Sequence, residues 1–161
     1  MITEDYVSFE TAKLLKEKGF DGKCYKVWAH YTSSTPKLWA APTFVEGETI
    51  VDRESVESAE RVWNMIYADS ENKYHGYLAP TLQMAMKWLR EKNIFIDIYH
   101  YNFRKAPFVW LIFAYNKLTP RAEQTYEQAA ESAIKYILEN WDDINEVLEK
   151  YYKNDEILQK I

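Results

Sequence analysis

Residues 79–101 join a short amphipathic helix directly to an alternating strand, and this unit constrains the fold more than any other stretch: APTLQMAMKWLREKNIFIDIYHY. Four apolar side chains recur at the i, i+3, i+4, i+7 spacing of one buried helix face: Leu82, Ala85, Met86 and Leu89. Met84 and Trp88 form a second apolar stripe, which predicts that the helix is covered on more than one side. Asn93 suits the left-handed conformation that ends a helix, so we expect the chain to turn there.

Residues 94–101 read as a strand, in which successive side chains point to opposite faces. One face carries Ile94, Ile96, Ile98 and His100, and the other carries Phe95, Asp97, Tyr99 and Tyr101. We expect the isoleucine face to pack against helices. The aromatic face, which holds one carboxylate, is then the one whose role needs explaining.

Two further helices are predicted with defined starts. Ser8 is a suitable N-cap for a helix over residues 9–18, and Gly19 is a suitable stop. Thr125 with Gln128 forms the pattern of a capping box. Apolar spacing then predicts a helix to residue 141 and a further one over 144–152, although one continuous helix fits the same pattern.

Strands are predicted at residues 24–31 and 108–116. The second is apolar on both faces, which favours a central strand, and it most simply forms a hairpin with residues 94–101. Helices connect the first strand to residues 94–101, so we expect those two strands to be parallel neighbours joined by a right-handed crossover. Between these two strands, a helix is expected to begin at Asp52 or Ser55 and to reach Ile66. Residues 46–48 read as a turn before it, and residues 69–76 read as a polar segment that ends it.

These elements predict an α+β fold with a small three-stranded sheet, mixed or antiparallel, and helices packed mainly on one face. The length of 161 residues fits a single domain over residues 1–161. Within it, residues 32–76 are interpreted as a variable insertion and residues 142–161 as a C-terminal helical extension.

Composition and charge exclude several classes of protein. A lone cysteine, Cys24, forms no internal disulfide and fits a reducing compartment, and no apolar run approaches the roughly 18 residues of a membrane span. With no basic start before an apolar run, a signal peptide is not expected, and we predict a cytoplasmic protein without a membrane partner. The net charge of −5 repels phosphate backbones, so long nucleic acid is not an expected partner.

Two stretches carry a resemblance to a known family: residues 7–20, VSFETAKLLKEKGF, and residues 79–92, APTLQMAMKWLREK. Together with the helix expected at 126–138, they resemble a family of small uncharacterised proteins from Bacteroides-group bacteria and their phages. The resemblance implies a phage or mobile-element origin, which favours binding and interference over housekeeping catalysis. It transfers no activity and no catalytic residues.

The sequence offers little for metal or cofactor chemistry. The three histidines His30, His75 and His100 have no metal-ligand spacing, and Cys24 alone does not anchor a zinc site. The four glycines match no phosphate-binding loop. We therefore predict no metal, no cofactor and no assigned catalytic residue.

Asp97 is the most informative single residue, because a carboxylate in mid-strand is disfavoured unless it is paired or exposed. As a functional group it would accept hydrogen bonds from a ligand or act as a general base. The structural alternatives are an ion pair with Lys26, Arg104 or Lys105, or simple exposure on an open sheet face.

The strand aromatics, with nearby basic residues, resemble a platform on which bases or flat ligands stack. The alternative is that most of them are core and cross-strand pairs. The candidate ligand-binding residues are Asp97, Tyr99, Tyr101, Arg104, Lys105, Tyr25, Trp28 and His100.

Three functions remain open at this stage. The first is a non-enzymatic binding protein, homo-oligomeric through its C-terminal helices, that recognises a protein or small ligand. The second is a nucleotide-ligand binder that sequesters a host defence signal. The third is a small hydrolase or transferase that uses Asp97 and a histidine.

Overall fold

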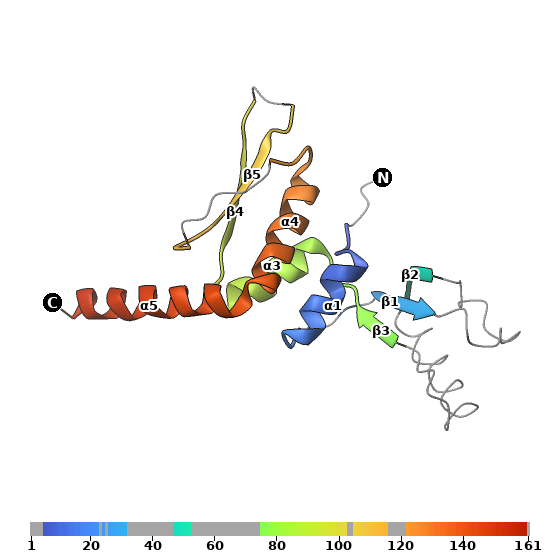
Figure 1. Cartoon of the computed structure of the whole chain (residues 1–161), viewed down its shortest axis with the longest axis horizontal. Helices are drawn as coiled ribbons and strands as arrows, with labels where there is room; N and C mark the ends of the chain where they lie inside the picture. The colour runs from blue at the N-terminus through green and yellow to red at the C-terminus, as the bar shows by residue number, and fades with distance from the viewer. Residues whose placement is uncertain are drawn as a thin grey trace, which may run out of the picture. The chain divides into compact units, whose positions relative to one another are not determined.

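A computed structural model describes residues 5–22, 24, 26–31, 47–52, 75–102, 105–115 and 122–160. The chain falls into two compact units, and each is described by itself. The N-terminal unit is Tyr6–Thr81, and the C-terminal unit combines Met1–Asp5 with Leu82–Ile161. Figure 1 shows the elements of both.

The N-terminal unit contains helix α1 (Phe9–Glu17) and strands β1 (Lys26–Tyr31), β2 (Gly47–Asp52) and β3 (His75–Leu78). The strands form an antiparallel sheet in the order β2-β1-β3. The ring of Phe9 meets Trp28 and Tyr77 edge-on, with centroids 6.2 and 5.4 Å away. Trp28 Nε1 donates a hydrogen bond to the Val7 carbonyl at 2.9 Å, which fixes the indole against the chain before α1.

Both predicted ends of α1 are confirmed. The Thr11 N–H donates to Ser8 Oγ at 3.2 Å, so the N-cap side chain satisfies a backbone donor of the first turn. At the other end Gly19 has φ +82°, a backbone conformation that residues with a Cβ rarely adopt. The chain then folds back, and the Phe20 N–H donates to the Leu15 carbonyl at 2.9 Å.

The C-terminal unit contains helix α3 (Leu82–Glu91), strands β4 (Ile96–His100) and β5 (Phe108–Ile112), and helices α4 (Tyr126–Glu139) and α5 (Trp141–Gln159). The helix-to-strand unit expected at residues 79–101 is confirmed: α3 ends, Asn93 adopts φ +61°, and β4 follows. β4 and β5 form an antiparallel hairpin, with Ile98 opposite Trp110. Helix α4 packs against this hairpin (Figure 1).

The core of the C-terminal unit is built from one face of each element. It contains the fully or nearly fully buried side chains of Leu82, Ala85, Met86, Trp88, Leu89, Ile94, Trp110, Ile112, Ala129, Ala130, Ala133, Ile134, Ile137, Leu138 and Ile144. The α3 residues in this set are the stripe that the sequence predicts, together with Trp88. The ring of Trp88 stacks on that of Trp141 at 5.5 Å, which joins α3 to the start of α5.

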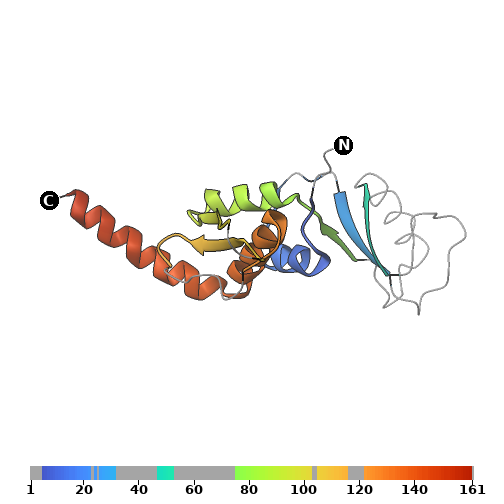
Figure 2. The ribbon, with the colours of Figure 1, turned by 90° about the horizontal axis from the view of Figure 1, so that it is seen from above.

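Residues 126–159 form two helices rather than one. At Asn140 the backbone leaves helical geometry, with φ −113° and ψ 31°, and the Asn140 side chain donates to the Tyr136 carbonyl at 2.9 Å. Asp142 and Asp143 then lie in the first turn of α5, where the positive end of the helix dipole stabilises acidic side chains. Figure 2 shows α5 extending beyond the hairpin.

The capping box of α4 gives a direct test of its start. The Gln128 N–H donates to Thr125 Oγ1 at 3.1 Å, and the Thr125 N–H donates to Gln128 Oε1 at 3.3 Å. Thr125→Ala should lower the free energy of unfolding by about 1 kcal/mol, because the N3 donor loses its acceptor. Urea denaturation measures the loss. Thr125→Ser keeps the hydroxyl and should stay close to wild type; equal losses for both variants would contradict this account of the helix start.

The fold class is confirmed as α+β with helices and a C-terminal helix, and so is the predicted hairpin of β4 with β5, but the expected pairing of β1 with β4 is wrong. β1 and β4 are not parallel neighbours, since they belong to different sheets. The neighbours of β1 are β2 and β3, from segments that were expected to be turn, helix start or polar loop. Pairing between distant segments overrode these local signals.

The strand after the hairpin turn is also less central than expected. Within the described residues, β5 pairs along its length with β4, and on its other side it has a single bridge from Phe108 to Glu123. Its apolar character therefore reflects burial of one face and partial cover of the other. The helix expected at residues 52–66 lies almost wholly outside the described residues. Among the helices that are described, none is long and apolar enough to cross a membrane.

Candidate functional site

The outer face of the β4–β5 hairpin is the candidate site. The Phe113 N–H donates to the Phe95 carbonyl at 3.0 Å, so these two residues lie opposite each other at the base of the hairpin. The same register puts Leu111 opposite Asp97 and Val109 opposite Tyr99. Because alternate residues share a face of a sheet, this side is lined by Phe95, Asp97, Tyr99, Tyr101, Val109, Leu111 and Phe113; we call it the hairpin face.

The aromatic side chains of the hairpin face are unusually open to solvent. The exposed fractions are 39% for Phe95, 46% for Tyr99, 52% for Tyr101 and 44% for Phe113. The face therefore offers large aromatic side chains to solvent from β4 and from the residues that flank the two strands, and two of them, Tyr99 and Tyr101, are candidate ligand-binding residues from the sequence.

The inner face shows why the outer one is left open. Trp110 and Ile112 are buried on the inner side, and the Trp110 indole N–H donates to Ser132 Oγ on α4 at 3.2 Å. The Trp110 ring also lies 5.3 Å from that of Tyr136. Since α4 covers this face, the core is completed on one side of the hairpin only.

Helix α5 adds one more aromatic residue beside the hairpin face. Tyr151 is 42% exposed, and its ring meets that of Phe113 edge-on at 5.7 Å. The neighbouring Tyr152 hydroxyl donates to the Asn93 carbonyl at 3.2 Å, which ties α5 to the start of β4. Burial raises the pKa of Tyr152, with smaller contributions from Tyr151 and Asp155.

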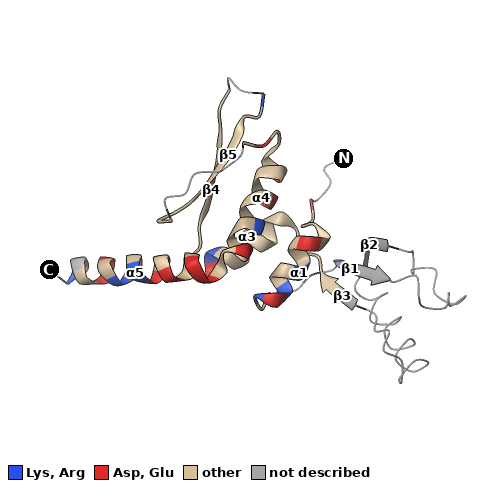
Figure 3. Cartoon of the chain, viewed as in Figure 1, with Lys and Arg blue, Asp and Glu red and all other residues tan. Residues whose placement is uncertain are grey.

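Charge is sparse on the hairpin and dense on α5. Figure 3 shows the two strands almost free of charged residues, whereas α5 carries alternating acidic and basic groups. Asp97 is exposed and forms no ion pair with any residue that the structure describes, so the exposure alternative holds for it there. On α5, Lys150 pairs with Glu146 at 2.6 Å, and this contact raises the pKa of Lys150.

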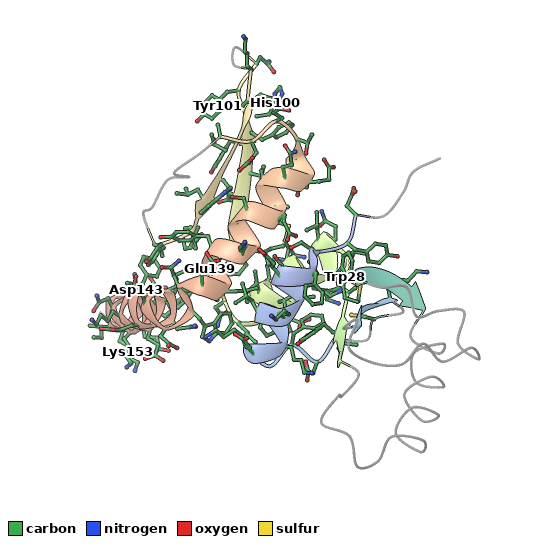
Figure 4. All side chains as sticks on the ribbon, turned by 45° about the vertical axis from the view of Figure 1, so that its right-hand side comes forward. Trp28, His100, Tyr101, Glu139, Asp143 and Lys153 are labelled. Atoms are coloured by element: carbon green, nitrogen blue, oxygen red, sulfur yellow. The ribbon has the colours of Figure 1, made fainter. Side chains whose placement is uncertain are left out.

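The predicted site residues are distributed unevenly. Asp97, Tyr99, Tyr101 and Lys105 lie together on the hairpin and its turn, and all are exposed. His100 points to the other face, where its ring lies 4.8 Å from that of Phe108. Figure 4 labels both Tyr101 and His100 at this end of the strand.

The remaining predicted site residues do not join this group. Trp28 belongs to the N-terminal unit, where it is half-buried beside Phe9. Tyr25 and Arg104 lie outside the described residues. Phe113 and Tyr151 were missed as candidates, although the hairpin register gives Phe113 its place opposite Phe95.

No set of catalytic side chains is brought together in the described part of the chain. No cluster of three histidine, cysteine or acidic side chains there is arranged to hold a metal ion. Asp97 and His100 lie on opposite faces of β4, so they do not form the acid–histidine pair of the hydrolase hypothesis. Cys24 is buried, as a structural thiol would be.

Comparisons with models of protein families, with curated proteins and with solved structures find no match to this chain.

Proposed function

We propose that this protein is a non-enzymatic binding protein that recognises an apolar surface of another protein through the hairpin face and Tyr151. The proposal is supported by one observation above all: five aromatic side chains that are 39–52% exposed occur together on and beside one two-stranded sheet. Large apolar side chains that gather on one exposed surface mark interaction sites, whereas singly scattered ones do not.

The chemistry of the face favours a protein partner. Tyrosine and phenylalanine are enriched in protein interfaces, because they bury a large rigid area at a small cost in side-chain entropy. Tyr99 and Tyr101 also bring hydroxyl groups that hydrogen-bond at the rim. An exposed two-stranded face suits the surface of another protein better than a small molecule, which needs a concave site.

Charge argues against a nucleotide on the same face. Asp97 lies between Phe95 and Tyr99, in the middle of the surface on which a base would stack. Its carboxylate repels a phosphate group, and Lys105 lies away from it, in the turn beyond Tyr101. In the phage or mobile-element setting that the sequence resemblance implies, we infer that the partner is a host protein.

Affinity capture with matched variants tests the proposal. The double variant Tyr99→Ser/Tyr101→Ser removes two exposed rings without touching the inner face. Proteins captured specifically by the wild type from a lysate of a Bacteroides-group bacterium should fall at least about tenfold with this variant, because central interface aromatics each contribute about 2 kcal/mol or more.

The control variant is Gln83→Ser/Lys87→Ser, which changes two exposed residues of α3 and should retain the captured proteins. A partner that survives loss of both tyrosines, or that is lost equally with the α3 control, would refute the hairpin face as its binding site. A nucleotide that raises the melting temperature of the wild type but not of Tyr99→Ser/Tyr101→Ser would instead establish the second function.

A further inference from the structure

We propose that two copies of this chain pair through the outer edge of β4, in an antiparallel register centred on Ile98, to form a four-stranded sheet. This inference goes beyond the proposed function, because it concerns pairing of the backbone edge of the strand with a second copy, whereas the proposed function concerns another protein on the hairpin face. It names the second copy as the occupant of that edge.

The hydrogen-bond pattern of the hairpin leaves this edge open. Tyr101 and Pro107 are a hydrogen-bonded pair, with the Tyr101 N–H donating at 2.8 Å. Such pairs alternate with pairs whose backbone groups point outward. The N–H and C=O groups of Ile96, Ile98 and His100 therefore point away from β5, and no residue that the structure describes bonds to them.

The two edges of the hairpin differ in this respect. On the β5 side, Phe108 and Glu123 exchange two backbone hydrogen bonds of 3.1 and 2.8 Å, which occupy the start of that edge. Among the described residues the β4 edge has no such bridge, and Ile96–His100 contains no proline or lysine; its one acidic residue, Asp97, lies on the hairpin face. Natural sheets protect free edges with those devices, so an edge that lacks them is suited to pairing with another strand.

The strand is complementary to itself in the register centred on Ile98. With Ile98 opposite Ile98 of the second copy, Ile96 lies opposite His100, and these outward-pointing residues supply every backbone hydrogen bond. On the outer face Asp97 then lies opposite Tyr99, whose hydroxyl donates to carboxylates. A shift of the second strand by two residues to centre on Asp97 would place two carboxylates directly opposite each other, which is destabilising.

The same register also extends the apolar surfaces of both faces. Ile96 and Ile98 are only half-buried in the single copy. In the paired strands, the inner face of the sheet brings His100 of the second copy next to Ile96, and Ile98 of the second copy next to Ile98. The two hairpin faces become one continuous aromatic surface. A two-fold interface of this kind is the commonest symmetry among homo-oligomers.

Mixed cysteine variants test the register directly. In the proposed pairing, Asp97 of one copy faces Tyr99 of the other at a Cα separation of about 4.5 Å, within reach of a disulfide. An equimolar mixture of Asp97→Cys and Tyr99→Cys should form a covalent dimer with oxidised glutathione as oxidant. Each variant alone should not, since diagonal positions lie about 7–8 Å apart.

The oligomeric state of the full chain tests the edge itself. We expect the wild type to have about twice the mass of 19.2 kDa in light scattering after size exclusion. Ile98→Pro removes an N–H that β5 does not use, so the hairpin persists in circular dichroism while the dimer dissociation constant rises at least tenfold. Ile98→Ala keeps the N–H and should remain dimeric.

Three results would overturn the proposal: a wild type that is monomeric at all concentrations, a dimer that Ile98→Pro leaves intact, or crosslinking of Asp97→Cys alone. Pairing of this edge with a strand of another protein would show as the first of these. Ile98→Pro keeps Tyr99 and Tyr101, so affinity capture with this variant tests the hairpin face in the absence of the dimer, and the two proposals can fail separately.

Discussion

Trp110→Ala should lower the free energy of unfolding of the C-terminal unit by about 3–5 kcal/mol, the range for truncating a large buried aromatic side chain. Trp110 is 1% exposed and forms the centre of the contact between β5 and α4. The substitution removes the ring contact with Tyr136 and leaves Ser132 Oγ without the indole donor. Because whole domains are stable by only about 5–15 kcal/mol, much of the stability of this unit would be lost.

Urea denaturation followed by circular dichroism measures this loss. Leu111→Ala is the control, because Leu111 is the next residue of β5 and its half-buried side chain points to the hairpin face. The control should lose about 1 kcal/mol or less, in keeping with substitutions outside the core. Equal losses at the two positions would mean that the hairpin does not have one buried and one open face, and the site assignment would fail with it.

The parts of the fold that the sequence predicts well are those fixed by neighbouring residues. The stripe of α3, the turn at Asn93 and the alternation of β4 all depend on spacing within about twenty residues, and all are present. Caps belong to the same class, because Ser8 and Thr125 act on donors three residues away.

The hairpin of β4 and β5 was predicted correctly, because its strands are close in the sequence, but the sheet of β1, β2 and β3 was predicted poorly, because its pairing depends on distant segments. β2 and β3 have six and four residues, and β3 contains Gly76, so their local signal is weak. The run Thr49-Ile50-Val51 was the available clue, since β-branched residues favour strands. Without β2 and β3, β4 was the natural neighbour to assign to β1.

The candidate site was also predictable only where it depends on neighbouring residues. Alternation alone places Phe95, Asp97, Tyr99 and Tyr101 on one face, and the exposed fractions agree with this. The contribution of Tyr151 was beyond sequence reasoning, because its contact with Phe113 depends on where α4 ends at Asn140 and on the direction that α5 then takes.

Leu15→Ala should destabilise the N-terminal unit by about 2–5 kcal/mol, because Leu15 is fully buried in α1 and the truncation leaves a cavity. Hydrogen exchange followed by mass spectrometry measures this in peptides that cover α1 and β1. Loss of 2 kcal/mol should speed exchange of the most protected amides about 30-fold, since exchange through opening follows the free energy of opening.

Leu14→Ala provides the control for that experiment, since it makes the same chemical change one residue earlier, at a half-buried position. Both variants alter the helix propensity of α1 equally, so any difference between them reports burial alone. Leu14→Ala should therefore speed exchange several-fold less than Leu15→Ala. If the order were reversed, α1 would pack through another face than the one that carries Leu15, and the positions of Phe9 and Trp28 derived from that packing would be wrong.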